Sequence, residues 1–135
     1  MKILGIEHIG IAVKDLKKRA PFWEHILGLS HQRNENVAEQ GVSTTIYDTN
    51  NSKVELLQPT NEGSPVEKFI ANRGEGLHHL CFEVDDIELA VTELKNAGIE
   101  LINETPRVGV EGYRVVFVHP KSTGGVLVEL AEKSR

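Results

Sequence analysis

The sequence predicts an α+β fold of two tandem βαβββ modules whose strands form a cupped, mostly antiparallel mixed sheet. Three observations support this prediction. A segment that begins at His8 recurs from His79, each copy is followed by an amphipathic helical segment, and each half ends in an apolar strand that carries one glutamate. An internal repeat decides the fold, because both copies are expected to adopt the same unit.

Each half opens with a strand in which β-branched residues follow the histidine, as expected for a half-buried pleated surface. A helix then begins after Asp15 in the first half and after Asp86 in the second, because an aspartate can accept hydrogen bonds from the free amides of the first turn. Gly28 and Gly98 follow the helical segments, where a left-handed residue ends a helix.

Three more strands follow in each half, separated by segments rich in turn-forming residues. Alternating or apolar patterns predict these strands most clearly at Val42–Tyr47, Lys53–Leu57, Tyr113–Val118 and Leu127–Leu130.

We expect residues 1–135 to form one domain, because 135 residues correspond to a single compact unit. Module one spans about residues 1–58 and module two about residues 77–135. The linker, about 59–76, is rich in Pro, Gly, Asn and Ser and contains a predicted short helix, Pro65–Asn72.

Composition excludes several functional classes. The formal net charge of −5 argues against nucleic-acid binding, which requires a clustered positive surface. A single cysteine, Cys81, excludes an internal disulfide framework and lies in an apolar run, which indicates a small buried side chain. No apolar run is long enough to span a bilayer and the N-terminus lacks signal-peptide features, so we expect a cytoplasmic protein with no membrane partner.

The repeat makes four metal-ligand residue types equivalent in pairs: a histidine in the first strand and a glutamate in the last strand of each half. Imidazole nitrogen and carboxylate oxygen are ligands that divalent first-row metals take. If the two sheets face each other, the four side chains converge and leave positions open for substrate, as in a catalytic site. The predicted metal ligands are His8, Glu55, His79 and Glu129.

Each of these residues also has a structural interpretation. A single strand histidine often binds backbone, and a single strand glutamate usually faces solvent. The symmetry of the pairs favours the metal site. His78 precedes His79 and points to the opposite face of a strand, while solvated or turn-capping roles suit His25, His31 and His119.

Several motifs give the chain a resemblance to a known family. It resembles the vicinal oxygen chelate (glyoxalase/bleomycin resistance) superfamily through the tandem modules and their His and Glu residues. Along nearly its whole length it is similar to the methylmalonyl-CoA epimerase family. The motifs that carry this second likeness are Glu39-Gln40-Gly41-Val42, Gly76-Leu77-His78-His79-Leu80 and His119-Pro120-Lys121-Ser122.

The resemblance implies a metal-dependent epimerase acting on an acyl-CoA thioester by α-proton abstraction through an enolate. It implies one divalent ion (Co, Mn, Ni, Zn or Mg, with the identity left open) and a homodimer. Inversion needs acid–base groups on opposite faces of the enolate. The family's proposed catalytic glutamate falls on Glu39, and the second group is Glu129, a metal-bound water or Glu111.

Two features of the expected site are specific to this chain. Relatives carry Glu or Gln at Glu55, and a glutamate there neutralises more of the metal charge and is expected to weaken its electrophilicity. Because the protein is net acidic, local basic residues must steer the CoA phosphates, and nothing in the sequence decides among the lysines at 14, 17, 18 and 121.

Two other functions remain open. One is a glyoxalase I-type lyase with the same fold and similar ligands, against which the Glu39-Gln40-Gly41-Val42 and His119-Pro120-Lys121-Ser122 motifs argue. The other is a metal-free binding module, which would leave two carboxylates and two imidazoles in a cavity without an ion to offset their desolvation.

Overall fold

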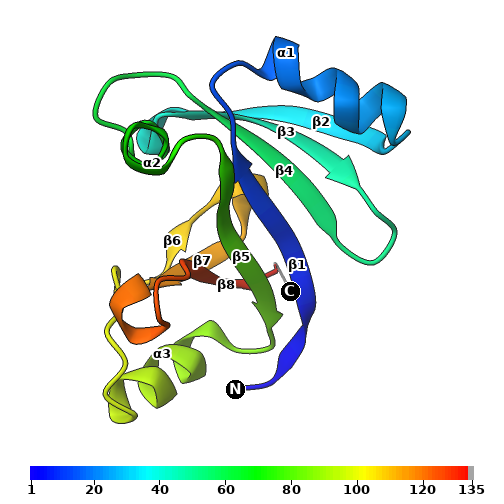
Figure 1. Ribbon diagram of the computed structural model, residues 1–135. Coiled ribbons are helices and arrows are strands. Elements are labelled where there is room, and N and C mark those ends of the chain that lie inside the picture. Colours follow the sequence, from blue (N-terminus) through cyan, green and yellow to red (C-terminus); the bar gives the residue numbers. More distant parts are fainter. Residues whose placement is uncertain (134–135) are drawn as a thin grey trace. The chain divides into compact units, whose positions relative to one another are not determined.

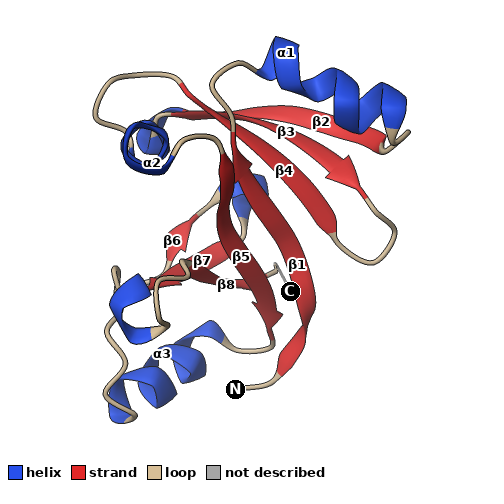
Figure 2. Cartoon of the chain, in the orientation of Figure 1, coloured by secondary structure: helices blue, strands red, loops and turns tan. Residues whose placement is uncertain are grey.

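A computed structural model describes residues 1–133 and confirms an α+β fold with two βαβββ modules (Figures 1 and 2). Its strands are β1 (Ile3–Ala12), β2 (Ser30–Val37), β3 (Val42–Asp48), β4 (Lys53–Pro59), β5 (Gly76–Val84), β6 (Arg107–Val108), β7 (Arg114–Val118) and β8 (Val128–Glu132). Its helices are α1 (Leu16–Pro21), α2 (Pro65–Arg73) and α3 (Ile87–Asn96), with short helical turns η1 (Phe22–Ile26), η2 (Ala38–Gln40), η3 (Val110–Gly112) and η4 (Pro120–Ser122).

The chain divides into two compact units, residues 8–78 and residues 1–7 with 79–135. Strand β1 contributes residues to both units. In the unit formed by residues 8–78, the strand order is β2-β3-β4-β1, with β1 and β4 parallel and the other pairs antiparallel. In the other unit the order is β1-β5-β8-β7-β6, with β5 and β8 parallel.

The predicted helix caps are confirmed. The side chain of Asp15 accepts a hydrogen bond from the Lys17 amide, and that of Asp86 accepts one from the Leu89 amide. The first helix continues beyond Pro21 as the single π-type turn η1 before Gly28 adopts a left-handed conformation. Helix α2 begins at Pro65 as predicted and extends one residue further, to Arg73.

Helices cover both faces of the sheet in the 8–78 unit. Leu56 packs with Val13 and Tyr47 beneath Leu16 of α1. Leu57 packs in a different cluster, with Val66 and Phe69 of α2. Adjacent residues of a strand point to opposite faces, so α1 and α2 lie on opposite faces of this sheet. The α2 face is also the face of Glu55, two residues before Leu57.

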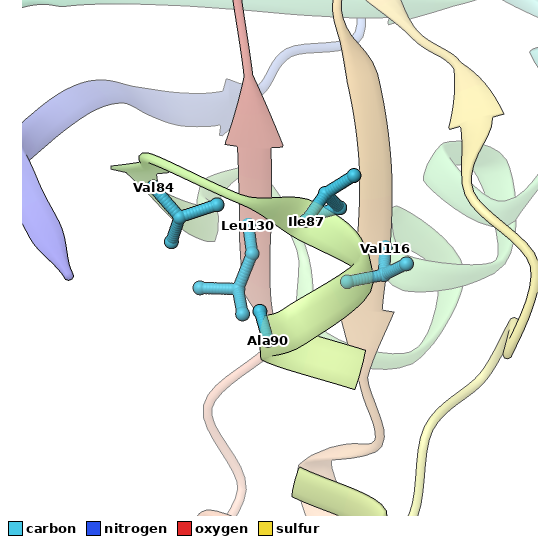
Figure 3. Close-up of a cluster of buried hydrophobic side chains, with 5 residues drawn as sticks. All are labelled: Val84, Ile87, Ala90, Val116 and Leu130. Atoms are coloured by element: carbon cyan, nitrogen blue, oxygen red, sulfur yellow. The ribbon is translucent and has the colours of Figure 1, made fainter. Parts of the chain in front are cut away.

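In the other unit, α3 packs on one face of β5, β8 and β7. Its core cluster is Val84, Ile87, Ala90, Val116 and Leu130 (Figure 3). The opposite face carries a second cluster around the fully buried Cys81, which confirms the apolar environment predicted for this thiol. No helix within residues 1–133 is long and apolar enough to cross a membrane.

Candidate functional site

The first His–Glu pair lies on the β1–β4 ladder. In the parallel register, Glu55 lies opposite Gly10, which is two residues after His8. The side chains of His8 and Glu55 therefore project from the same face of the sheet. Nδ1 of His8 lies 3.2 Å from Oε2 of Glu55. The two residues are 5% and 1% exposed, so this is a buried pair.

The second pair repeats this arrangement on the β5–β8 ladder. Glu129 is opposite Cys81, which is two residues after His79. Nε2 of His79 lies 3.1 Å from Oε1 of Glu129, and the ring contacts Phe117 edge-on at a centroid distance of 6.2 Å. The side chains of His79 and Glu129 are 8% and 6% exposed.

Both pairs therefore follow one rule: a glutamate on the last strand lies opposite the residue two positions after the histidine. Each pair offers one imidazole nitrogen and one carboxylate oxygen in a buried setting. This donor chemistry fits a divalent metal such as Zn²⁺, Mn²⁺ or Co²⁺. A buried carboxylate is costly unless it is paired or binds a cation, and a metal ion would meet this requirement in each pair.

Glu39 lies on η2, the short turn between β2 and β3, and is exposed. Val42 follows this turn at the start of β3, where it lies opposite Pro59. Glu55 lies opposite Ile46, which is four residues further along β3 than Val42. Four residues of extended chain span about 13 Å. Glu39 is therefore presented from the end of the sheet and remains accessible to a ligand.

Glu111 lies on η3 and adopts a positive φ of 68°, which is uncommon for a residue other than glycine. Gly109, the residue before η3, packs closely on the His79–Glu129 face. A Cβ at Gly109 would lie 3.1 Å from the Val115 methyl groups and 3.7 Å from Oε2 of Glu129. The turn that carries Glu111 thus begins beside Glu129.

The remaining histidines have other surroundings. His78 contacts the Phe69 ring at 5.0 Å, and His31 lies with Nε2 3.0 Å from Oδ1 of Asn34. Nδ1 of His119 accepts a hydrogen bond from the Lys121 amide, which is the turn-capping role expected for it. His25 is exposed.

Sequence reasoning missed two buried carboxylates. Glu132 is 7% exposed and accepts a hydrogen bond from the Ile87 amide at 3.2 Å, and the second is Glu7. It is 4% exposed, and its Oε2 lies 3.1 Å from Nζ of Lys133, which also approaches Glu83 at 3.6 Å. Burial lowers the pKa of Lys133, but the hydrogen bond to Glu7 and the charges of Glu7, Tyr113 and Glu83 together raise it more, so the net pKa is raised. The available signal was that Glu7, a charged residue, directly precedes the predicted ligand His8 in a strand. Its partner Lys133 is more than 100 residues away in the sequence, so the ion pair itself left no local signal.

A cavity of about 810 Å³ opens in the 8–78 unit on the other face of the sheet, beneath α1. Lys14 and Lys17 line it, together with Glu24 and Tyr47. Burial, together with the charge of Glu24, raises the pKa of Tyr47, so this phenol is neutral at physiological pH. Because Tyr47 and Glu55 point to opposite faces, the sheet separates this cavity from the His8–Glu55 pair.

Comparison with known families places these features in context. Residues 7–117 match the family described as glyoxalase/bleomycin resistance protein/dioxygenase superfamily. The human protein named mitochondrial methylmalonyl-CoA epimerase is 42% identical over 94% of this chain and 73% of its own length. A Cereibacter sphaeroides protein named ethylmalonyl-CoA/methylmalonyl-CoA epimerase is 38% identical over 94% of this chain and 96% of its own length.

Solved structures show the same likeness. A variant of the Streptomyces coelicolor methylmalonyl-CoA epimerase, in complex with 2-nitronate-propionyl-CoA, has a TM-score of 0.93 to this chain and is 35% identical. The match covers 98% of this chain and 96% of that chain. Identity above 30% along nearly the full length establishes common family membership.

Proposed function

Because this chain belongs to the methylmalonyl-CoA epimerase family of the glyoxalase/bleomycin resistance protein/dioxygenase superfamily, we propose that it interconverts the two epimers of methylmalonyl-CoA. The observation that carries this proposal is the pair of equivalent, buried His–Glu ladders, His8 with Glu55 and His79 with Glu129. Two such pairs supply the donor set for one ion with open positions, which this reaction requires.

In the proposal, His8, Glu55, His79 and Glu129 would together hold a single divalent ion. When bound, such an ion acts as a Lewis acid that stabilises the enolate formed from the thioester. The two carboxylates balance the two positive charges of the ion, and the two neutral imidazoles complete a mixed nitrogen and oxygen shell. This donor set suits Co, Mn, Ni, Zn or Mg to different degrees, and metal availability decides among them.

The chain's own residues move the proton. Glu39 takes the α-proton, so that a C–H bond breaks, an O–H bond forms on its carboxylate and the electron pair passes into the planar enolate. A second group then delivers a proton to the opposite face and restores the C–H bond with inverted configuration. The exposed position of Glu39 supports its role, because the carboxylate must reach the substrate carbon.

Two residues of the other unit are candidates for the second face. Glu129 can hold the ion through one oxygen and accept a proton on the other. Glu111 is the other candidate, because its turn begins beside Glu129 and its backbone is held at a positive φ, a feature that recurs at functional sites. A water on the ion is the third alternative.

We also propose a homodimer in the cytoplasm. Ile3, Leu4 and Ile6 at the start of β1 are each more than 40% exposed, which is apolar surface that a second copy would cover. Light scattering after size-exclusion chromatography measures the mass of the assembly directly.

The exposed Lys121 and the lysines of the α1 cavity are available to attract the CoA phosphates.

The decisive experiment follows the α-proton of methylmalonyl-CoA by proton NMR in deuterated water, with metal-loaded protein and a metal-stripped control. We expect rapid metal-dependent loss of the α-proton signal together with interconversion of the epimers. A metal-bound protein without such exchange would contradict the proposal and direct attention to a hemithioacetal lyase assay. A protein that binds no metal would instead favour a binding module. Ethylmalonyl-CoA in the same assay measures the breadth of substrates.

A further inference from the structure

The turn that carries Glu39 ends at a glycine whose backbone is fixed on both sides. Gly41 has φ of 62° and ψ of 40°, a left-handed conformation that ends the η2 turn. Its amide donates to the Ala38 carbonyl at 3.1 Å, and its own carbonyl accepts a hydrogen bond from the Thr60 amide at 2.8 Å. The turn is therefore tied to the segment that follows β4.

The same segment approaches Gly41 too closely for any side chain. A Cβ at Gly41 would lie 2.7 Å from Oδ1 of Asn61 and 2.8 Å from the Cβ of Ser64. Both distances are shorter than a normal van der Waals contact, so one of the groups would have to move. The glycine is needed here for space as well as for its backbone conformation.

Ser64 cannot move easily, because it is 4% exposed and starts helix α2. Its hydroxyl accepts a hydrogen bond from the Glu67 amide at 3.2 Å, while the Glu67 side chain accepts one from the Gly63 amide at 2.9 Å. These two bonds resemble a capping box, except that Glu67 accepts from the amide just before the N-cap, and they fix the first turn of the helix. A displacement of Ser64 would disrupt both bonds.

Helix α2 is in turn packed on the sheet next to the same turn (Figure 1). Val66, Phe69 and Ile70 pack in one cluster with Val37 and Val42, the residues on either side of the turn. The Glu39 turn is thus held from its flanks by α2 and at its end by the 60–64 segment.

We propose that Gly41 and the 60–64 segment position the Glu39 carboxylate for proton transfer. The inference rests on the proposed role of Glu39, and it assigns to the segment that joins the two modules a function in catalysis. Gly41 is a positioning residue: it touches no substrate, but its contact with Asn61 and Ser64 sets where the η2 turn lies. A misplacement of about 1 Å at a reacting group can cost about 10²-fold in rate.

The test compares Gly41→Ala with Gly28→Ala. Gly28 has a similar φ of 71°, but no atom lies within 4 Å of a Cβ built there, so its alanine variant carries the backbone strain without the steric clash. We expect Gly41→Ala to lower kcat about 10²-fold, with little change in KM or metal content. Gly28→Ala is expected to lose thermal stability but to retain kcat.

A second variant separates displacement from general damage. Adding Ser64→Gly to Gly41→Ala removes the clash with the Ser64 Cβ and leaves only the contact with the flexible Asn61 side chain, which can rotate away. Glycine at a helix N-cap is tolerated better than alanine. We expect this double variant to recover a large part of kcat. Normal kcat in a folded Gly41→Ala protein, or an equal loss of kcat in Gly28→Ala, would overturn the positioning role.

The wild-type protein and Glu39→Gln complete the set. A wild-type protein without epimerase activity refutes the proposed function, and the positioning role fails with it. An active wild-type protein, an inactive Glu39→Gln variant and a fully active Gly41→Ala variant refute the positioning role alone.

Discussion

Nδ1 of His8 lies 3.2 Å from Oε2 of Glu55, and the parallel register that produces this contact recurs between His79 and Glu129. Glu55 lies opposite a glycine, Gly10, and Glu129 lies opposite a cysteine, Cys81. Small side chains at these two positions leave space for the carboxylates on the same face. This shared geometry underlies the effects expected of substitutions at His79 and Glu55.

Replacing His79 by alanine is expected to abolish stoichiometric metal binding and to reduce epimerisation to the rate of the metal-stripped protein. The matched control is His31→Ala, since His31 is exposed and shares the Tyr47 face of its sheet, opposite the face of the His8–Glu55 pair. Metal content is measured by mass spectrometry on the purified variants. Full metal occupancy in His79→Ala would remove this residue from the ligand set.

Replacing Glu55 by glutamine tests the charge of the metal shell. The amide keeps one oxygen ligand but removes one negative charge, so we expect weaker metal affinity and a higher kcat at saturating metal. Metal titration and steady-state kinetics at saturating metal measure the two effects separately. If both metal content and turnover are unchanged, the charge of Glu55 has no influence on the reaction.

Replacing Glu39 by glutamine is expected to lower kcat by about 10²- to 10⁴-fold, the contribution of a positioned general base. Because Glu39 is exposed, the midpoint of thermal unfolding and the metal content are expected to stay at wild-type values. Exchange of the α-proton in deuterated water is measured from each epimer separately. Loss of exchange from only one epimer would show that Glu39 serves one face of the enolate.

Replacing Leu56 by alanine is expected to lower the free energy of unfolding by about 2–5 kcal/mol, because the side chain is fully buried beneath α1. Leu77, which is 71% exposed, provides a control whose alanine variant is expected to change stability by less than about 0.5 kcal/mol. Urea titration of both variants gives the values. Equal stability of the two variants would contradict the packing described for the α1 face.

The ion pair between Arg19 and Glu75 predicts a pH-dependent contribution to stability. Hydrogen bonds from Arg19 and from the Lys14 amide lower the pKa of Glu75 below its ordinary value of about 4.5. A carboxyl group with a lowered pKa stabilises the fold above 4.5, and this contribution is lost as the pH falls through the folded-state value. The effect is small because the pair lies at the surface, where Arg19 is exposed and solvent screens the interaction.

Glu75→Gln is therefore expected to reduce the slope of stability against pH below about 4.5 and to leave the slope unchanged near neutrality. Thermal unfolding measured in steps from pH 3 to pH 7 (on the order of one unit per step) compares the variant with the wild-type protein. If stability depends on pH in the same way in the variant and the wild-type protein, the Glu75 carboxylate makes no contribution.

Local signals in the sequence predicted much of the fold. The repeat placed both modules, and Asp15 and Asp86 start their helices because a capping interaction involves only neighbouring residues. The π-type continuation of the first helix was not predicted, because hydrogen-bond spacing within a helical segment leaves no separate mark on apolar periodicity.

The site was predictable in its residue types but not in its contacts. Equivalent positions in a repeat identified the two His–Glu pairs, and the register of each parallel ladder brings the members of each pair within 3.2 Å. Glu7 was missed, since its buried state depends on Lys133 at the far end of the chain.

By itself, the sequence determined the order of the elements, the chemistry of the four proposed ligands and the family to which the chain belongs. Only the tertiary structure decided which side chains share a face, what buries Glu7 and why Gly41 must be a glycine. The physical reason is that caps and periodicity act within a few residues. Strand register and the close approach of Asn61 and Ser64 to Gly41 instead arise from contacts that form when separate segments pack together.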